Sequence, residues 1–444
     1  MASRRATLYA AVSSVAGWAF DLFDLFILLY IAGTVGKLIF PAHSPTLSLA
    51  AVYASFAVSV LLRPAGAAIF GVVADRSGRK KTMVVVLAGV GLSTAAMGLV
   101  PTYAAAGITA PLLFLALRLV QGIFVGGVVA ATHTLGTESV PPRWRGLMSG
   151  LIGGGGAGVG AALASGLYIG VSQLFPGEQF TVWGWRVMFL SGLVAALLSY
   201  LVVRGVEESP LWKAAHQAGP PPRTRLADLV RGGRGKVFAL NIVLVAGAGS
   251  QYYLTSGYLP TLLGDVTGVR GGTQGVILLV SSLGVVLGTI VAGELSEHLG
   301  RRRTMLAFGA VNLVALPLLV WLISSSDPGA TTAILWYSTA LGFLANAAYA
   351  PVLVFLNERY PTALRSRGTA VCWNLGFMIG GLMPTFVNLA SPGLADVPSR
   401  LVVFLGVMVA VFLVANAISP ETRGGMDEPA SRAVARTPNK EEIL

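Results

Sequence analysis

The chain has 444 residues, of which 55% are apolar and only 11% are charged, and its mean hydropathy is +0.74. A water-soluble protein carries roughly 25% charged residues, so this composition excludes an ordinary soluble domain and favours a protein that crosses a membrane many times. The net charge of +12 raises the question of nucleic-acid binding, which the distribution of the basic residues answers below.

Apolar blocks of about 20 residues recur along the chain, and each is long enough to cross a hydrocarbon core as a helix. The first block continues past two aspartates, so we interpret it as a spanning helix and not as a cleavable signal peptide. The expected helices are 12–36, 48–71, 83–101, 111–135, 147–172, 185–204, 237–260, 274–293, 304–324, 332–356, 369–390 and 401–418.

Basic residues gather in alternate connections between these helices. The rich segments are 4–5, 76–81, 143–145, 204–236, 301–303, 359–367 and the tail, whereas the opposite connections hold only Lys37, Arg186, Arg270 and Arg400. Cytoplasmic loops of membrane proteins are the ones enriched in Lys and Arg. We therefore expect both termini to be cytoplasmic, and we interpret the positive charge as a topology signal, with no nucleic-acid partner.

The predicted organisation is two bundles of six helices joined by a polar linker. We assign residues 1–204 to the N-terminal bundle, 205–236 to a cytoplasmic linker, 237–420 to the C-terminal bundle and 421–444 to a cytoplasmic tail. The fifth helix is unusually rich in glycine, which suits either tight helix packing or a sliding interface. Because Cys372 is the only cysteine, no intramolecular disulfide is possible.

Two local patterns occur twice, half a chain apart. Residues 71–81 (GVVADRSGRKK) return 222 positions later as 293–303 (GELSEHLGRRR), and 138–146 (ESVPPRWRG) is echoed at 358–368. Two unrelated motifs rarely keep nearly the same offset by chance. The chain is therefore interpreted as two copies of one unit, a common plan in secondary transporters.

These segments resemble known transporter motifs. The glycines and charges of 71–81 resemble the signature loop of the major facilitator superfamily, and RLVQG at 118–122 is similar to a second motif of that superfamily. WAFDLFD at 18–24 resembles the first helix of the sialate/monocarboxylate:proton symporters. Residues 184–186, 207–210 and 252–261 resemble both that group and the metabolite:proton symporters. The resemblance implies an all-α membrane protein with twelve transmembrane helices in two pseudo-symmetric six-helix bundles.

Asp21 and Asp24 are three residues apart in the first expected helix, so they share one helix face. Carboxylates inside a membrane are costly and usually face water, pair with a cation or bind a proton. Two so close raise each other's proton affinity, so we predict a proton-coupling site, with Asp24 as the first candidate. Arg118 must meet an anion, either an aspartate or the substrate. The alternative is a structural ion pair with Arg118 or Arg63.

The C-terminal half offers neutral polar side chains at mid-span. Such groups suit the carbonyl, hydroxyl or carboxylate oxygens of a small solute, although an interhelical hydrogen bond is the commoner role for each one alone. The cluster at 251–253 is the first candidate. The predicted substrate-binding residues are Arg118, Gln121, Gln251, Tyr252, Tyr253, Asn346 and Asn374.

The duplicated loops are interpreted as a gate on the cytoplasmic side. A carboxylate such as Asp75 can lie against the positive N-terminus of a facing helix, and the resemblance implies that this contact closes the cytoplasmic face in an outward-open state. The second copy has Glu297 and His298 instead of Asp75 and Arg76, so its gate is degenerate. The predicted gate residues are Gly71, Asp75, Arg76, Gly78, Arg79, Glu138, Arg145, Glu297, Arg301, Glu358 and Arg367.

Together these features predict a proton-coupled symporter that imports a small organic anion, such as lactate or pyruvate, by alternating access. The alternatives are a di- or tricarboxylate, sialate or zwitterion symporter, and a drug:proton antiporter. The last commonly has Gly-Pro in its fifth helix, which this sequence lacks.

No metal spacing, nucleophile elbow or phosphate loop occurs in the sequence, so we expect no enzyme activity and no cofactor beyond the coupling proton. The expected partners are the organic anion, protons and membrane lipid. We expect a monomer in the inner or plasma membrane.

Overall fold

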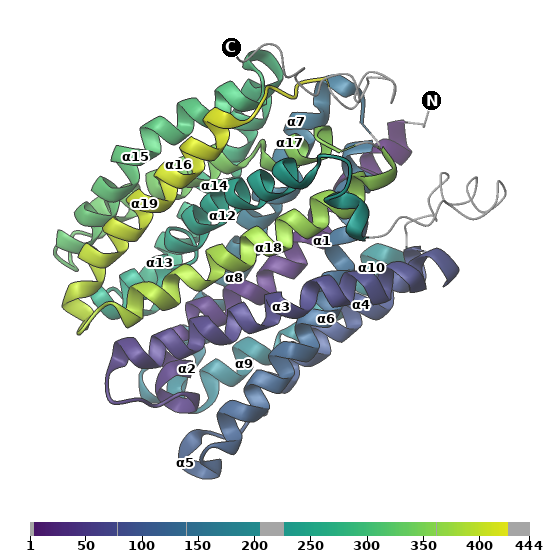
Figure 1. The fold of residues 1–444 in the computed structure, drawn as a ribbon. Helices are drawn as coiled ribbons and strands as arrows, with labels where there is room; N and C mark the ends of the chain where they lie inside the picture. The colour runs from purple at the N-terminus through teal and green to yellow at the C-terminus, as the bar shows by residue number, and fades with distance from the viewer. Residues whose placement is uncertain (1–3, 78, 139, 205–225, 361, 425–444) are drawn as a thin grey trace.

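The computed structural model describes residues 4–77, 79–138, 140–204, 226–360 and 362–424, and for parts of some helices only the backbone. None of these residues forms a β-strand, and long helices run side by side along one direction (Figure 1). The first and last described residues lie at the same end of the molecule, called here the terminal end. The opposite end is called the distal end.

The N-terminal half is interrupted at three places where one continuous helix was predicted, one of which is Ser191, between Leu190 and Gly192. The first helix breaks at Ile31, and the fifth contains a π-helical turn at Leu151–Gly155, where a run of glycines weakens the regular helix. The helices of this half are α1 (Arg4–Tyr30), α2 (Ala32–Ile39), α3 (Pro45–Ser77), α4 (Arg79–Met97), α5 (Tyr103–Ala106), α6 (Thr109–Glu138), α7 (Arg145–Gly150), α8 (Gly156–Leu174), α9 (Trp185–Leu190) and α10 (Gly192–Arg204).

The C-terminal half repeats this arrangement with its own interruptions. Its first long helix unwinds after Leu254, and a short helix and a π-helical turn at Leu262–Val266 lead to the next. The helices are α12 (Gly235–Leu254), α13 (Leu259–Thr261), α14 (Gly271–Leu299), α15 (Arg301–Ser325), α16 (Thr331–Tyr349), α17 (Val352–Glu358), α18 (Thr362–Leu389) and α19 (Val397–Ile418).

The predicted spans correspond to helices in the structure. Among the described residues, eleven helical segments are long and apolar enough to cross a membrane. The remaining expected helix, 83–101, corresponds to α4, whose apolar part, Val84–Met97, is shorter.

Close packing inside the N-terminal half depends on glycines where α3 crosses α6. A Cβ on Gly122 would overlap the backbone of Ser59, and one on Gly126 would overlap the backbone of Arg63. Such small residues let two helix backbones meet at van der Waals distance. The crossing holds Arg63 of α3 at the level of α6, close to the polar residues considered below.

The two halves meet along two pairs of helices. α8 packs against α14, and α3 packs against α18. The glycine-rich fifth span takes part in this contact, because a Cβ on Gly158 would overlap Val286 and the backbone of Ser282. In this conformation the glycines serve tight packing between the halves.

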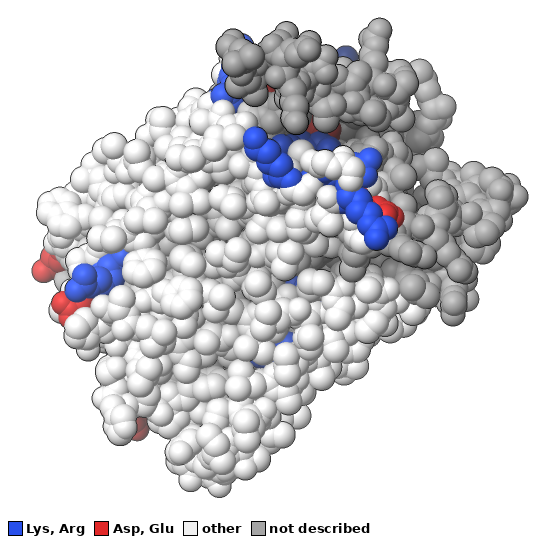
Figure 2. Space-filling model, viewed as in Figure 1, with Lys and Arg blue, Asp and Glu red and all other residues white. Residues whose placement is uncertain are grey.

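The outer surface fits a lipid environment. α10, α15 and α19 expose Leu, Val and Trp side chains that no other part of the described chain covers. Figure 2 shows a broad band in which only small patches of Lys or Arg are visible, with most Lys and Arg gathered near the terminal end and a smaller charged group at the distal end. This surface is typical of a multi-pass membrane protein.

Candidate functional site

Asp24 lies at the centre of a buried hydrogen-bond cluster inside the N-terminal half. The Thr94 hydroxyl of α4 donates to Oδ1 of Asp24, and Nε2 of Gln121, from α6, donates to Oδ2 at 2.5 Å. Gln121 also donates to the Thr94 oxygen at 2.8 Å. Both carboxylate oxygens of Asp24 are thus bound by neutral donors. Thr94 has no charge and no motif to mark it, and sequence reasoning missed it.

Arg118 reaches this cluster through Gln121. Its Nη1 donates to Oε1 of Gln121 at 2.6 Å, and its guanidinium lies 5.7 Å from the centre of the Phe114 ring. The side chain is only 1% exposed, yet Nε and Nη2 have no hydrogen-bond partner among the described residues. Free donors on a buried cation favour a nearby anion. The structure therefore brings Asp24 and Arg118 together with Gln121 between them, and not as a direct ion pair.

Asp21 lies one helical turn nearer the terminal end than Asp24. It is 5% exposed, and its Oδ1 has no hydrogen-bond partner within the described part of the chain. The charged groups that act on it most strongly are Arg63 and Asp24. Arg63 is itself buried, 6.0 Å from the centre of the Phe56 ring. Asp21, Asp24, Arg63 and Arg118 thus form a buried set of two negative and two positive charges.

One cavity lies wholly inside this half, and we call it the N-terminal cavity. Its empty volume is about 330 Å³, and its polar lining consists of Asp21, Asp24 and Thr94. The rest of its lining comes from apolar or small residues of α1, α4, α6 and α10, which are Phe20, Phe23, Leu87, Val90, Gly91, Val128, Gly192, Ala195 and Ala196.

A second cavity lies between the halves, and we call it the interface cavity. Its empty volume is about 370 Å³, and its lining has no charged residue. Two hydroxyls on its wall, Oη of Tyr252 and Oγ of Ser281, are buried and lack a hydrogen-bond partner among the residues described. The lining is Phe26, Tyr30, Ala157, Gly158, Ala161, Tyr252, Ser256, Leu259, Leu278, Ser281, Ser282, Val285, Leu341 and Gly342.

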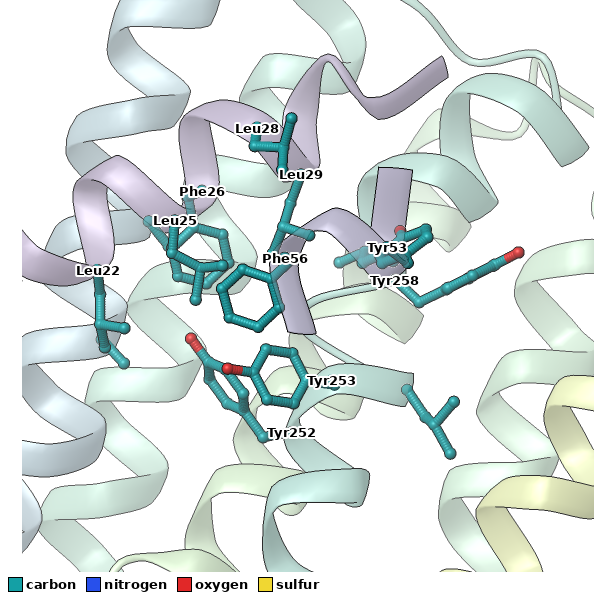
Figure 3. Packing of buried hydrophobic residues seen from close by; sticks show 14 of the residues in the cluster. Leu22, Leu25, Phe26, Leu28, Leu29, Tyr53, Phe56, Tyr252, Tyr253 and Tyr258 are labelled. Carbon is teal, nitrogen blue, oxygen red and sulfur yellow. The ribbon is translucent and has the colours of Figure 1, made fainter. Parts of the chain in front are cut away.

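Aromatic rings surround Tyr252. Its ring lies 5.2 Å from that of Tyr253 and stacks on Tyr349 at 6.1 Å between centres. Phe26 and Phe56 approach these tyrosines from the N-terminal half, so both halves contribute to the cluster (Figure 3). Of these residues, sequence reasoning selected only the adjacent tyrosines. Phe26 and Phe56 are ordinary apolar residues of their helices until the halves are brought together.

Three residues predicted as substrate ligands have other roles in this structure. Gln251 accepts a hydrogen bond from Asn312 at 3.0 Å, which joins α12 to α15, and it lines neither cavity. Arg118 and Gln121 also lie outside the interface cavity, because they belong to the Asp24 cluster. A sequence shows that polar groups lie at mid-span, but not toward which neighbouring helix they point.

The two remaining asparagines lie on helices of the C-terminal half. Asn346 donates to Oγ of Ser256, a residue of the interface cavity, at 3.0 Å. Asn374 donates to the Ala370 carbonyl at 2.9 Å, within its own helix. In both, Oδ1 has no hydrogen-bond partner among the described residues. Asn346 is therefore placed to act on the interface cavity through Ser256, whereas Asn374 does not line it.

The interface is closed at the distal end by side chains from both halves. The Tyr53 hydroxyl is hydrogen-bonded to Thr261 at 3.0 Å, and its ring stacks on Tyr258 at 5.4 Å (Figure 3). The Tyr168 hydroxyl donates to Gln274 at 2.9 Å. These contacts cover the interface cavity on that side.

The interface is also closed at the terminal end. Arg301 forms ion pairs with Glu297 at 3.1 Å and Glu358 at 3.2 Å, and Glu297 accepts a hydrogen bond from the backbone of Gly146 in the other half. The backbone of Val354 donates to Ser149 at 3.1 Å. The two halves are therefore in contact at both ends of the interface.

Most of the remaining predicted gate residues belong to the first copies of the two repeated motifs. Arg145 lies half-buried at the start of α7. The other predicted gate residues, Gly71, Asp75, Arg76, Gly78, Arg79, Glu138 and Arg367, lie outside the part of the chain whose side chains are described. The degenerate second copy, with Glu297 and Arg301, is the one seen to join the halves.

The chain is similar to known bacterial transport proteins. It is 31% identical over 425 residues to the inner membrane metabolite transport protein YhjE of Escherichia coli K12, covering 93% of this chain and 94% of that protein. It is 27% identical to a proline/betaine transporter of Salmonella typhimurium, covering 98% and 88%, and 27% identical to a citrate-proton symporter of Salmonella typhi, covering 86% and 87%.

Among solved structures, a D-xylose-proton symporter matches with a TM-score of 0.71 and 16% identity, over 94% of this chain and 99% of the other. This likeness confirms the predicted all-α, twelve-helix fold. The sequence profile described as Major Facilitator Superfamily matches residues 9–384 and 242–441. The chain therefore belongs to the Major Facilitator Superfamily, a family of membrane transporters and not of enzymes.

Proposed function

We propose that this protein is a proton-coupled symporter that imports a small organic anion by alternating access. The observation that carries the proposal is the separation of a buried, charged cluster around Asp24 from an uncharged cavity between the halves. The first suits a proton and the second suits a solute. The similarity to a citrate-proton symporter supports both parts.

Charge balance gives a physical reason for coupling. When Asp21, Asp24, Arg63 and Arg118 are all ionised, their charges cancel. A proton on Asp24 leaves one unit of positive charge buried, and an uncompensated charge in a low-dielectric interior is costly. An anion in the neighbouring cavity offsets that charge. Proton and anion therefore stabilise each other's binding, as symport requires.

Hydrogen bonding connects the proton to Arg118. Ionised Asp24 accepts from Thr94 and Gln121, and Gln121 in turn holds Nη1 of Arg118. Protonation turns one carboxylate oxygen into a donor, which competes with the Nε2 donor of Gln121. The cluster then rearranges and changes the position of the guanidinium. In this scheme, Gln121 and Arg118 act on the substrate through the proton site.

We propose a monocarboxylate such as lactate or pyruvate as the substrate. One negative charge matches one bound proton, and the free hydroxyls of Tyr252 and Ser281 are donors for a carboxylate. The empty volume of about 370 Å³ includes open space, and the cavity itself has room for about one water molecule in this conformation, so the solute enters when the halves separate. Asn346 acts on this site through Ser256, and Tyr253 packs beside Tyr252, whereas Asn374 stays a predicted ligand that does not line the cavity in this conformation.

A zwitterion is the second candidate, because the tyrosines and Phe26 beside the cavity form an aromatic wall. Such rings attract ammonium groups, and one relative is named as a proline/betaine transporter. A zwitterion carries no net charge, so it does not balance the proton on Asp24.

The remaining sequence predictions become part of the same proposal. Residues 1–204 and 237–420 act as two rocking bodies, 205–236 connect them, and 421–444 are a cytoplasmic tail. The terminal end faces the cytoplasm of the inner or plasma membrane, and the protein acts as a monomer. The contacts of Arg301 then form part of the cytoplasmic gate.

Uptake into proteoliposomes tests this function. Lactate, pyruvate, citrate, shikimate and glycine betaine are offered as radiolabelled solutes, with and without an inward proton gradient. We expect the gradient to drive accumulation of a monocarboxylate, and a protonophore to remove it. Gradient-driven uptake of betaine alone favours the zwitterion. If the gradient drives uptake of none of the solutes, the proposal of symport fails.

A further inference from the structure

We infer that the N-terminal cavity is a water-holding passage that carries protons between Asp24 and the terminal end, separate from the path of the solute. The inference rests on the proposed proton coupling and adds a route to it. The N-terminal and interface cavities share no lining residue.

The N-terminal cavity extends from Asp24 toward the terminal end. α1 and α4 begin at the terminal end, whereas α6 and α10 end there, so Phe20, Leu87, Val128 and Ala196 all lie on the terminal side of Asp24. Thr94 and Leu87 are seven residues apart on α4, which is about 10 Å along the helix axis. The cavity therefore extends from the proposed proton site toward one side of the membrane.

The cavity lining also includes a buried carboxylate oxygen that has no donor among the described residues. Asp21 lines the cavity, is 5% exposed, and its Oδ1 has no hydrogen-bond partner within the described chain. A buried carboxylate oxygen without a donor is costly, and a water molecule is the smallest group that supplies one. The cavity has room for at least one water molecule. Such a water can join Asp21 to Asp24, one turn away.

One wall of the N-terminal cavity is built from small residues. Where α10 passes α4, the lining residues are Gly91, Gly192, Ala195 and Ala196, and a Cβ on Gly91 would overlap Ala196. The helices are thus in contact at one point, and short side chains leave space beside it. Val194, which directly precedes Ala195 on α10, is 57% exposed on the outer face. Only a thin wall of small residues separates the cavity from the outside of the bundle.

The transfer itself moves only a proton. Protonated Asp24 gives its proton to the water, the water gives one to ionised Asp21, and Asp21 releases it toward the terminal end. The charged or titratable groups around Asp21 are Asp24 on its own helix, Arg63 on α3, and Tyr252 and Tyr253 on α12. Arg118 on α6 acts on Asp24. The cavity lining from α4, α6 and α10 adds no titratable group.

A filled cavity provides the first test. Ala195→Leu places a large apolar side chain in the passage, and Val194→Leu makes a matched change on the outer face. In proteoliposomes loaded with a pH-sensitive dye, we expect Ala195→Leu to slow lactate-driven proton entry and gradient-driven lactate uptake at least tenfold. We expect it to leave lactate exchange at equal pH unchanged, whereas Val194→Leu leaves all three unchanged. Asp21→Asn should likewise slow lactate-driven proton entry and gradient-driven lactate uptake.

Hydration provides a second test that needs no substrate. Ala195→Cys and Val194→Cys are each made in a Cys372→Ser chain. Each protein is first exposed to Ag⁺, an ion of nearly the size of water. The thiols that have not reacted with Ag⁺ are then measured by alkylation. We expect the thiol at 195 to react at least tenfold faster than the thiol at 194. Equal rates mean a dry cavity and overturn the inference.

The results separate the two proposals. One outcome is that wild-type vesicles show proton-driven lactate uptake and Ala195→Leu matches wild type in both lactate uptake and proton entry. In that case the inferred proton passage is wrong and the proposal of symport stands. If wild-type vesicles show no proton-driven uptake of any solute in the panel, symport and the passage both fall.

Discussion

The N-terminal cavity contains two carboxylates and belongs to one half of the molecule, whereas the interface cavity is uncharged and is built by both halves. The difference matters because only the second changes shape when the halves move against each other. Under the proposed function, the proton site lies within one bundle and keeps its surroundings, whereas the solute site lies at the interface that opens to either side.

The same comparison explains why the chain is duplicated in scaffold but not in chemistry. At mid-span the N-terminal half buries Asp21, Asp24, Arg63 and Arg118, whereas the described C-terminal half buries serines, asparagines and tyrosines. Its buried charges, Glu297 and Arg301, lie at the terminal end. The chemistry of each half thus follows its task.

The largest effect is expected from removing the carboxylate of Asp24 in the N-terminal cavity. Asp24→Asn keeps the shape but cannot take up a proton, so we expect gradient-driven accumulation to fall by about 100-fold or more. Exchange of solute across equal pH should persist, because the interface cavity is intact. Radiolabelled uptake and counterflow measure the two quantities. Undiminished accumulation by this variant would transfer the coupling role to Asp21 and remove the distinction drawn for Asp24.

The next effect concerns closure of the interface. A Cβ on Gly146 would lie 2.6 Å from both Nη1 of Arg301 and Oε1 of Glu297. We therefore expect Gly146→Leu to disfavour closure at the terminal end by about 1–3 kcal/mol, and to slow transport accordingly. Spin labels at Trp144 and His298, one on each half, should then report longer distances. Gly166→Leu is the control, because a Cβ on Gly166 contacts nothing within 4 Å.

A smaller effect is expected in the interface cavity. Tyr252→Phe and Ser281→Ala each remove one unpaired hydroxyl, and a hydrogen bond to a charged group is worth about 1.5–3 kcal/mol. We therefore expect each to raise the KM for lactate about tenfold without uncoupling the proton. Ser282→Ala is the matched control, since the Ser282 hydroxyl already donates to the Leu278 carbonyl. An equal rise in KM for all three would show that the free hydroxyls are not the ligands.

The smallest effect is expected outside both cavities. Gln251→Leu removes the hydrogen bond with Asn312, and bonds of this kind in membrane proteins average about 0.6 kcal/mol. We expect slightly lower thermal stability in detergent and an unchanged KM. A large rise in KM, with stability intact, would return Gln251 to the solute site where the sequence placed it.

Much of the fold follows from the sequence, for a simple physical reason. In a membrane, backbone polar groups must be satisfied within each span, so apolar blocks of sufficient length form helices. Hydropathy therefore predicted the spans, and the two echoed motifs predicted the duplication. The break at Ile31 and the π-helical turn at Leu151–Gly155 were not predicted. Such local irregularities depend on packing with neighbouring helices.

The candidate site was also only partly predictable from the sequence. A carboxylate inside an apolar span is conspicuous, so Asp21, Asp24 and Arg118 were recognisable in the sequence alone. Thr94 and Ser281 were not, because hydroxyl residues are common in spanning helices and become relevant only beside a particular neighbour. Gln251 was placed at the solute site, but its hydrogen bond is to Asn312.

The sequence by itself determined that the protein is a membrane transporter of duplicated design with buried charges in its first half. These properties depend on composition and on residues close together in the chain. Only the tertiary structure decided that Gln121 separates Arg118 from Asp24, and that the charged and uncharged cavities share no residue. Both facts depend on which helices meet and at what rotation, and many distant packing contacts together fix that arrangement.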